Sequence, residues 1–217
     1  MNTLNKLIKK MLADAQVSVQ ALPQCPDLSL YLVDPITMNR AFTLDEIRSI
    51  WDNTAYWAFC WASGQVLAQH ILDHPELVEG KKILDFGSGS GVVAIAAMKA
   101  GAKQAIACDI DPDALISCAE NAKLNGVNIE LSDDLFAIKD NDIDLLIAAD
   151  VLYDRANLSF LDTFFKYANE VLLADSRIKD FSHPQYHHVS RQESFTVPDL
   201  DELDEFRYVN LYTGMKP

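Results

Sequence analysis

Three aspartates stand at the ends of short apolar stretches, where side chains could meet a ligand. Asp85 closes the stretch that begins at Lys82, Asp109 follows residues 104–108, and Asp150 follows residues 143–149. After Asp85 and Phe86, the chain reads Gly-Ser-Gly-Ser-Gly at residues 87–91. Glycine lets a backbone approach a ligand closely, and carboxylates accept hydrogen bonds from hydroxyl and ammonium groups. The pattern therefore predicts a site for a small molecule that carries such groups.

The glycine spacing distinguishes between nucleotide-like cofactors. A dinucleotide fingerprint requires glycine at Val92, and a phosphate-binding P-loop requires Gly-Lys-Ser/Thr; both are missing. Asp85 would also repel a pyrophosphate, which disfavours an NAD-dependent oxidoreductase. S-adenosylmethionine has no phosphate. Its ammonium suits Asp85, and its carboxylate suits the amides at a helix N-terminus.

Two further carboxylates complete the predicted cofactor site. Asp109 is placed to accept both ribose hydroxyls of S-adenosylmethionine. Asp134, preferred to its neighbour Asp133, is placed to accept the adenine amino group. Each acid alone could be a helix cap or a loop residue. Because these acids follow three successive predicted strands in order, we favour cofactor binding over those separate roles.

Alternating strands and helices must position these residues. The chain is expected to be α/β, with a doubly wound, mostly parallel, seven-stranded Rossmann-like sheet. Residues 1–50 are expected to form an N-terminal extension with a helix and a short strand at 28–33, and residues 51–217 the catalytic domain. The predicted strands are 82–86, 104–108, 127–131, 143–149, 171–174, 194–197 and 206–212, and the predicted helices are 65–72, 92–100, 111–125 and 158–170.

Composition narrows the possible partners. The 217 residues carry a net charge of −14, which disfavours binding to nucleic acid. The longest apolar run is far shorter than the roughly 18 residues of a membrane span. Four cysteines without a C-x-x-C pair, and no signal peptide, predict buried free thiols in the cytoplasm. His183, His187 and His188 lack ligand spacing, so no metal is expected.

Residues 85–91 resemble motif I of the class I S-adenosylmethionine-dependent methyltransferases, and Asp109 resembles their ribose acid. Residues 56–65, rich in aromatic side chains, are similar to a segment of the seven-strand protein-lysine methyltransferases. Asp150-Val-Leu-Tyr153 resembles their D-x-x-Y motif. The nearest kin are the electron-transfer-flavoprotein β-subunit lysine methyltransferases and proteins called predicted nicotinamide N-methylases. The resemblance implies these cofactor-binding residues: Gly87, Ser88, Gly89, Gly91, Asp109, Ile110 and Asp150.

The acceptor site is expected at Asp150 and Tyr153. Asp150 would accept N–H groups of the amine that receives the methyl group, and Tyr153 would line the site. Trp57 and Trp61 would pack over the cofactor and stabilise its positive charge by cation–π contact. Packing of both tryptophans on one helix, and capping of the next turn by Asp150, remain alternatives.

The family pattern differs from this sequence at a few positions. A second glycine usually occupies the position of Ser63, and a longer Asp-Pro-Gly-Arg stretch that of residues 175–177. Asn-Pro-Pro-Tyr, typical of enzymes that methylate glutamine amides or adenine amines, is missing after residue 149.

N-methylation of a protein lysine is therefore the leading prediction. Methylation of a small molecule, such as a nicotinamide-like heterocycle or an amine, is the alternative. A catalytically silent cofactor-binding protein is a third. The oligomeric state stays open.

Overall fold

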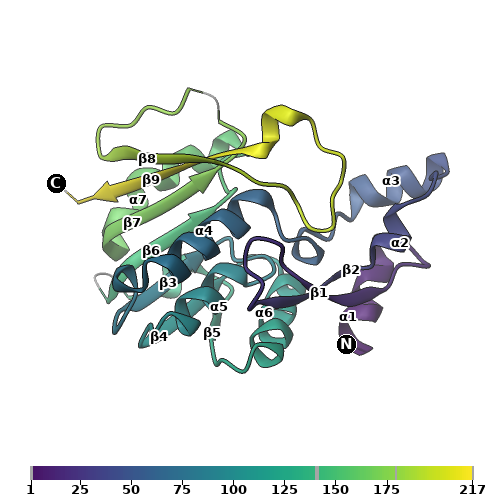
Figure 1. The fold of residues 1–217 in the computed structure, drawn as a ribbon, viewed down its shortest axis with the longest axis horizontal. Coiled ribbons are helices and arrows are strands. Elements are labelled where there is room, and N and C mark those ends of the chain that lie inside the picture. Colours follow the sequence, from purple (N-terminus) through teal and green to yellow (C-terminus); the bar gives the residue numbers. More distant parts are fainter. Residues whose placement is uncertain (1, 140–141, 179, 217) are drawn as a thin grey trace.

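A seven-stranded sheet forms the centre of the computed structural model, which describes residues 2–139, 142–178 and 180–216 (Figure 1). The strand order is β5-β4-β3-β6-β7-β9-β8, and β9 alone among the described strands of this sheet runs antiparallel to its neighbours. The strands are β3 (Lys82–Phe86), β4 (Gln104–Cys108), β5 (Glu130–Ser132), β6 (Ile143–Ala149), β7 (Ala168–Asp175), β8 (Tyr186–Glu193) and β9 (Tyr208–Met215).

Helices cover both faces of this sheet, which explains why its central strands are apolar throughout. α4 (Ala62–Asp73), α5 (Val92–Lys99) and α6 (Pro112–Leu124) pack on one face, and α7 (Phe160–Tyr167) packs on the other. Successive residues of β3 point to opposite faces: Ile83 joins the core under α4 and α5, and Leu84 joins the core under α7. The predicted doubly wound α/β fold is confirmed.

The N-terminal residues pack on this sheet-and-helix body. They form α1 (Asn2–Leu7), β1 (Val17–Ala21), β2 (Ser29–Val33), α2 (Pro35–Met38) and α3 (Leu44–Asp52). Leu4, Ile8 and Met11 are buried with Trp57, so the predicted amphipathic helix packs on the protein. The strand predicted at 28–33 is confirmed as β2, which pairs with β1 in an antiparallel hairpin.

Several predicted elements differ from the structure in their bounds. The strand predicted at 171–174 is β7, which begins at Ala168, and the one predicted at 206–212 is β9, which ends at Met215. The strand predicted at 127–131 begins at Glu130, because residues before it close the turn after α6. The helix predicted to reach residue 170 ends at Tyr167, because β7 already pairs with β6 at Ala168. The strand predicted at 194–197 lies too late in the chain, because the strand in this region is β8, which ends at Glu193. β8 is a mostly exposed edge strand, so its sequence has no pattern of apolar residues.

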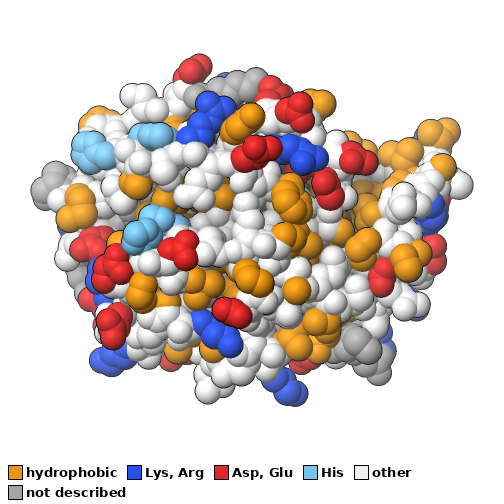
Figure 2. Space-filling view, in the orientation of Figure 1, with side chains coloured by type: hydrophobic (Ala, Val, Ile, Leu, Met, Phe, Trp, Pro, Cys, Tyr) orange, Lys and Arg blue, Asp and Glu red, His pale blue; other side chains and the backbone are white. Residues whose placement is uncertain are grey.

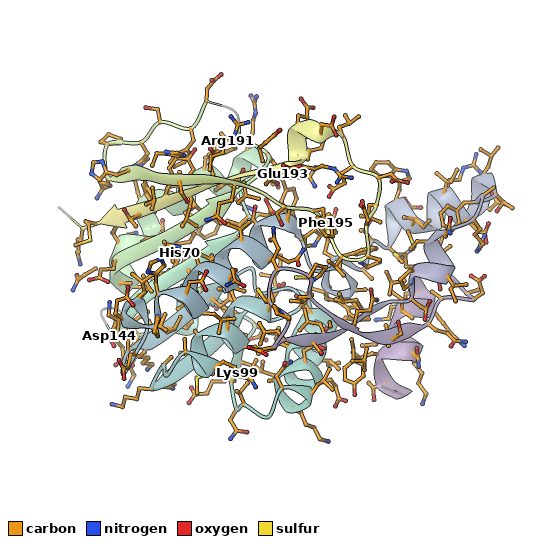
Figure 3. All side chains as sticks on the ribbon, viewed as in Figure 1. His70, Lys99, Asp144, Arg191, Glu193 and Phe195 are labelled. Atoms are coloured by element: carbon orange, nitrogen blue, oxygen red, sulfur yellow. The ribbon has the colours of Figure 1, made fainter. Side chains whose placement is uncertain are left out.

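Short 3-10 helices complete the described elements: η1 (Ile8–Lys10), η2 (Tyr56–Ala58), η3 (Pro75–Leu77), η4 (Leu135–Ala137), η5 (Arg155–Ser159) and η6 (Asp204–Arg207). After β8, the chain leaves the sheet near Glu193 and crosses α4 at Phe195 (Figure 3). The Phe195 carbonyl accepts from Gln65 Nε2 at 2.6 Å, and Val197 forms an isolated bridge with Cys60. None of the helices in the described ranges is long and apolar enough to cross a membrane.

Candidate active site

The glycine-rich turn joins β3 to α5 at the carboxyl edge of the sheet. Gly87, Gly89 and Gly91 have positive φ angles of 69°, 50° and 79°. A Cβ atom at Gly87 would lie 2.7 Å from Val151 Cγ1, and one at Gly91 would lie 3.1 Å from Cys118 Sγ. A Cβ at Gly89 would meet nothing within 4 Å, so the turn opens to a ligand at Gly89.

Asp109 holds this turn in place from the end of β4. Its Oδ2 accepts from Gly89 N at 2.9 Å, and its Oδ1 accepts from Asp111 N at 3.0 Å. Desolvation raises the pKa of the carboxyl, which is half-buried. The next side chain, Ile110, is 89% exposed and offers an apolar surface beside it.

Asp85 lies deeper than the other two strand-end acids. It is buried, and its Oδ2 accepts from Ala94 N in the first turn of α5 at 3.0 Å. Burial raises the pKa of this carboxyl to about 7. The carboxyl therefore connects β3 to α5, and its predicted contact with a ligand ammonium stays a prediction.

The loop after β5 carries Asp134 on its exposed side. Asp134 Oδ1 accepts from Phe136 N at 2.8 Å and caps η4. The Phe136 ring is exposed, although its centroid lies 6.4 Å from that of Phe160. Sequence reasoning missed Phe136; the signal available was a large aromatic residue in a polar loop.

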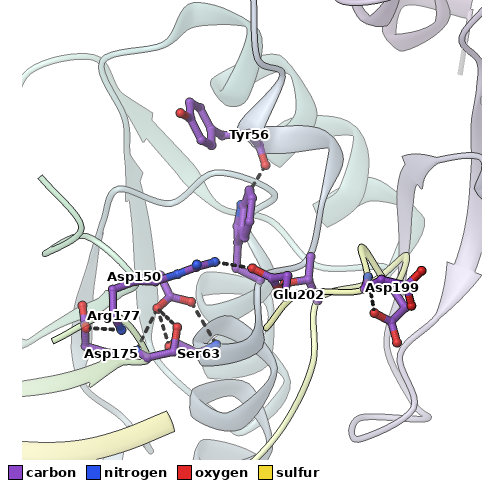
Figure 4. Close-up of polar contacts among 11 residues, drawn as sticks. Tyr56, Ser63, Asp150, Asp175, Arg177, Asp199 and Glu202 are labelled. Carbon is purple, nitrogen blue, oxygen red and sulfur yellow. Dashed lines mark hydrogen bonds and ion pairs between the residues drawn. The ribbon is translucent and has the colours of Figure 1, made fainter. Parts of the chain in front are cut away.

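Asp150, at the end of β6, is held in one orientation (Figure 4). Its Oδ1 accepts from Ser63 Oγ at 2.6 Å, Ser176 Oγ at 2.9 Å and Ser176 N at 3.1 Å. Its Oδ2 accepts from Ser63 N at 3.1 Å. Its φ of 50° is a left-handed conformation, which is uncommon outside glycine. Asp150 therefore caps α4 from the neighbouring strand, rather than only the turn that follows it.

Ser63 and Ser176 are functional candidates that sequence reasoning did not propose. Both stand at positions where the sequence departs from the family pattern. The two departures meet at one carboxylate, because α4 begins beside the ends of β6 and β7. The spatial convergence of two unusual serines on Asp150 could not be read from sequence spacing.

Aromatic residues stand close in the chain to Asp150 and to its partner Ser63. Tyr153 is 59% exposed and stacks on Tyr56, with ring centroids 6.0 Å apart. Trp61 is half-buried; its Nε1 donates to the Tyr56 carbonyl at 3.1 Å. Trp57 lies in η2 and is 2% exposed, packed among N-terminal residues. The two tryptophans thus do not share a helix, and Trp57 offers almost no surface to a ligand.

Arg177 connects the end of β7 to the loop before β9. It pairs with Glu202, which also accepts from Thr196 Oγ1. The Arg177 guanidinium lies 4.2 Å from the centroid of the Phe206 ring and 6.0 Å from that of Trp61. This network, visible in Figure 4, fixes the loop next to the aromatic rings.

A pocket of about 520 Å³ opens beside Tyr153, between the segments that follow β6 and β7. Leu152, Leu158, Arg177 and Phe181 contribute to its walls. Within the part of the chain that the structure describes, no group of three or more His, Cys, Asp or Glu side chains could hold a metal ion. The described polar groups can bind and orient an amine or a hydroxyl-bearing ligand.

Comparisons with known proteins match this arrangement to methyltransferases. The ribosomal protein L11 methyltransferase family matches residues 66–158. Among solved structures, a ribosomal protein L11 methylase from Lactobacillus delbrueckii subsp. bulgaricus has a TM-score of 0.53 at 24% identity, over 71% of this chain and 79% of that one. An RNA methyltransferase from Salinibacter ruber, in complex with S-adenosyl-L-homocysteine, has a TM-score of 0.51 at 18% identity, over 70% and 91%. These likenesses establish the fold.

Curated relatives are more similar in sequence. The electron transfer flavoprotein beta subunit lysine methyltransferase of Rattus norvegicus is 33% identical over 82% of this chain and 72% of its own length. Its counterpart from Danio rerio is 32% identical over 88% of this chain and 76% of its own length. The chain therefore belongs to the electron transfer flavoprotein beta subunit lysine methyltransferase family and is a class I S-adenosylmethionine-dependent methyltransferase.

Proposed function

We propose that the protein transfers the methyl group of S-adenosylmethionine to the side-chain nitrogen of a lysine in a protein substrate. The electron transfer flavoprotein beta subunit, which names the relatives, is the candidate acceptor. Two observations carry this proposal: the Asp150 carboxylate is fixed by Ser63 and Ser176, and the Tyr56–Tyr153 ring pair is exposed. A carboxylate and aromatic rings together suit a cationic or amine side chain.

The residues around the glycine-rich turn suit an adenosyl ligand. Gly89 leaves open space at the turn, and the Asp109 carboxylate beside it is placed to accept ribose hydroxyls. Ile110 and Phe136 offer exposed apolar surface for a flat base, and Asp134 is placed at its polar edge. Ser88 and Gly91 shape the turn, and Trp61, which directly precedes α4, would pack over the cofactor. Asp85 anchors the turn to α5, because its carboxylate accepts a hydrogen bond from Ala94 N.

The acceptor amine must be neutral and aligned when it attacks. Bound S-adenosylmethionine supplies an already activated methyl group, so the protein chiefly positions the amine and excludes water. Among the described residues, Asp150 Oδ2 accepts one hydrogen bond, from Ser63 N, so this oxygen can also accept an amine N–H. Burial raises the pKa of Tyr153, so its phenol stays protonated and orients the amine rather than removing its proton.

Exposure and charge favour a protein over a small molecule as the acceptor. Tyr56 and Tyr153 are both well exposed, whereas a small-molecule site usually buries most of its ligand. The net charge of −14 favours a cationic target and disfavours nucleic acid. The four cysteines are buried free thiols, which suits a reducing compartment such as the cytoplasm.

A methyl-transfer assay separates these acceptors. The purified protein is incubated with S-adenosylmethionine labelled in its methyl group and with electron transfer flavoprotein beta subunit, and the products are separated by size. Label is expected in the protein fraction. The Asp150→Asn variant is expected to lose at least about tenfold in turnover while it keeps its affinity for S-adenosylhomocysteine. Label in the small-molecule fraction alone would contradict the proposal.

A further inference from the structure

The helix α3 carries an apolar stripe on its outer side. Leu44, Ile47 and Trp51 are 74%, 39% and 79% exposed. Their spacing of three and four residues puts them on one side of the helix. Figure 2 shows hydrophobic side chains gathered at the corner of the molecule that α3 forms. A contiguous exposed apolar surface next to a candidate active site marks an interaction surface.

The opposite side of α3 faces the protein. Ser49 Oγ donates to the Met11 carbonyl at 2.8 Å, and Ile50 packs against the N-terminal cluster. A capping box of Thr43 and Glu46 begins the helix. α3 is therefore anchored with its stripe outward, and the exposure of the stripe is part of the folded structure.

An acidic loop lies near the same N-terminal cluster. Residues 199–205 include five acidic side chains, and Leu200 between them packs against the cluster that also contacts Ile50. Glu202 pairs with Arg177 and Asp199 pairs with Arg207 at 3.4 Å, whereas Asp201 and Asp204 are exposed. In Figure 1, α3 and the η6 loop both lie at the end of the molecule toward which the parallel strands run.

The chain connects this surface directly to the acceptor site. Trp51 ends the stripe, and only a short link separates it from Tyr56, which stacks on Tyr153. The apolar stripe is therefore linked to the Tyr56–Tyr153 ring pair by residues 52–55 of the chain.

We infer that the stripe of Leu44, Ile47 and Trp51, together with the acidic loop 199–205, is the docking surface for the protein methyl acceptor. The acceptor carries apolar side chains flanked by lysine or arginine around its target lysine. This inference rests on the proposed function, since it assigns the substrate of that site.

Charge favours a basic protein partner over a second copy of this chain or an anionic membrane. A second copy of this chain would bring another net charge of −14, and a two-fold interface here would place its own acidic loop close to this one. An anionic membrane surface would meet the same repulsion. A basic protein face complements the acidic loop and would also be drawn toward it before contact.

The stripe is tested with the double variant Leu44→Ser/Trp51→Ser, and Val189→Ser serves as a control. Val189 is an exposed apolar residue on β8, at the far edge of the sheet. With electron transfer flavoprotein beta subunit as substrate, the double variant is expected to raise KM at least about tenfold, because buried apolar anchors dominate such interfaces. Its kcat and its affinity for S-adenosylhomocysteine are expected to stay within about twofold of wild type. For the control, the KM, the kcat and this affinity are all expected to stay within about twofold of wild type.

The acidic loop is tested by the dependence of KM on salt. Asp201→Asn/Asp204→Asn is expected to raise KM at low salt and to flatten its increase with salt, because exposed charges are screened. Asp27→Asn, an exposed acid on the N-terminal segment, is expected to leave the salt dependence unchanged.

Each other outcome overturns the inference. An active wild type whose KM is unaffected by Leu44→Ser/Trp51→Ser would exclude the docking surface and leave the proposed function standing. A wild-type dimer that the double variant converts to a monomer, measured by light scattering, would make the stripe an interface between copies. A wild type that binds S-adenosylhomocysteine but methylates no protein would overturn the proposed function and this inference together.

Discussion

At the scale of single residues, the two half-buried strand-end acids have different hydrogen-bond partners. Asp109 uses both oxygens to fix the backbone at Gly89 and Asp111, yet it remains half-buried beside open space. Asp150 is fixed by two serines from different elements. The first is suited to hold a cofactor, and the second to hold an amine. The hydrogen-bond partners of Asp109 and Asp150 therefore distinguish the roles that we propose for these two residues.

The assignment of Asp109 to the ribose predicts a loss of cofactor affinity. Asp109→Asn is expected to weaken S-adenosylhomocysteine binding at least about tenfold, because a neutral amide replaces a charged acceptor worth about 1.5–3 kcal/mol per hydrogen bond. Isothermal titration calorimetry measures the effect, and Asp27→Asn is the control. Equal dissociation constants for Asp109→Asn and wild type would remove Asp109 from the cofactor site.

The buried Asp85 predicts a specific dependence of stability on pH. Burial raises its pKa from 3.8 to about 7. Between these values the folded protein holds a proton that the unfolded chain has released, so the contribution of Asp85 to stability falls as pH rises through this window. The fall is at most about 1.4 kcal/mol per pH unit.

Urea unfolding between pH 4.5 and 7 tests this contribution. The free energy of unfolding of Asp85→Asn is expected to fall less steeply with pH than that of wild type over this range, because the amide does not titrate. The exposed Asp27→Asn should keep the wild-type slope. Parallel curves for Asp85→Asn and wild type would show that the Asp85 carboxyl titrates normally.

At the scale of elements, the turn after β3 is shaped by three glycines with unequal surroundings. Gly87 and Gly91 are enclosed by Val151 and Cys118, whereas Gly89 faces open space. The glycine spacing in the sequence predicted the turn, and the chemistry of the turn stays a prediction. The spacing could not show which glycine faces open space, because that depends on side chains from α6 and from the loop after β6.

A matched pair of glycine variants tests the open side of this turn. Gly89 and Gly126 have φ angles of 50° and 70°, and a Cβ at either would meet nothing within 4 Å. Gly89→Ala and Gly126→Ala are therefore both expected to cost about 1 kcal/mol of stability from the left-handed backbone. Only Gly89→Ala is expected to abolish the calorimetric signal of S-adenosylhomocysteine binding. Intact binding by Gly89→Ala would place the cofactor elsewhere.

The central strands were predictable because burial on both faces makes them apolar from end to end. β3, β4 and β6 have the predicted bounds. β8 was not predictable, since an exposed edge strand needs only backbone pairing with β9. α3 was missed although its signals were in the sequence: Thr43 and Glu46 have the capping-box spacing, and apolar residues follow at spacings of three and four.

At the scale of the whole molecule, the site lies where the carboxyl ends of the parallel strands meet the N-terminal segment. Residues 1–50, which we propose as an extension of the catalytic domain, share a buried cluster with Trp57 and Phe59 next to the site. They also supply α3. The extension also contacts the glycine-rich turn through α6, because Tyr31 N donates to Asn121 Oδ1 at 2.7 Å and Asn121 Nδ2 donates to the Ser90 carbonyl at 2.9 Å.

Mass spectrometry of the acceptor tests the central claim most directly. Electron transfer flavoprotein beta subunit is incubated with S-adenosylmethionine and either wild-type protein or Asp150→Asn, then digested and mapped. The expected result is methylation on the side-chain nitrogen of lysine with wild type, and little or none with Asp150→Asn. Methyl groups on other residue types, or an unmodified acceptor in the presence of enzyme that binds S-adenosylhomocysteine, would contradict lysine methylation of this substrate.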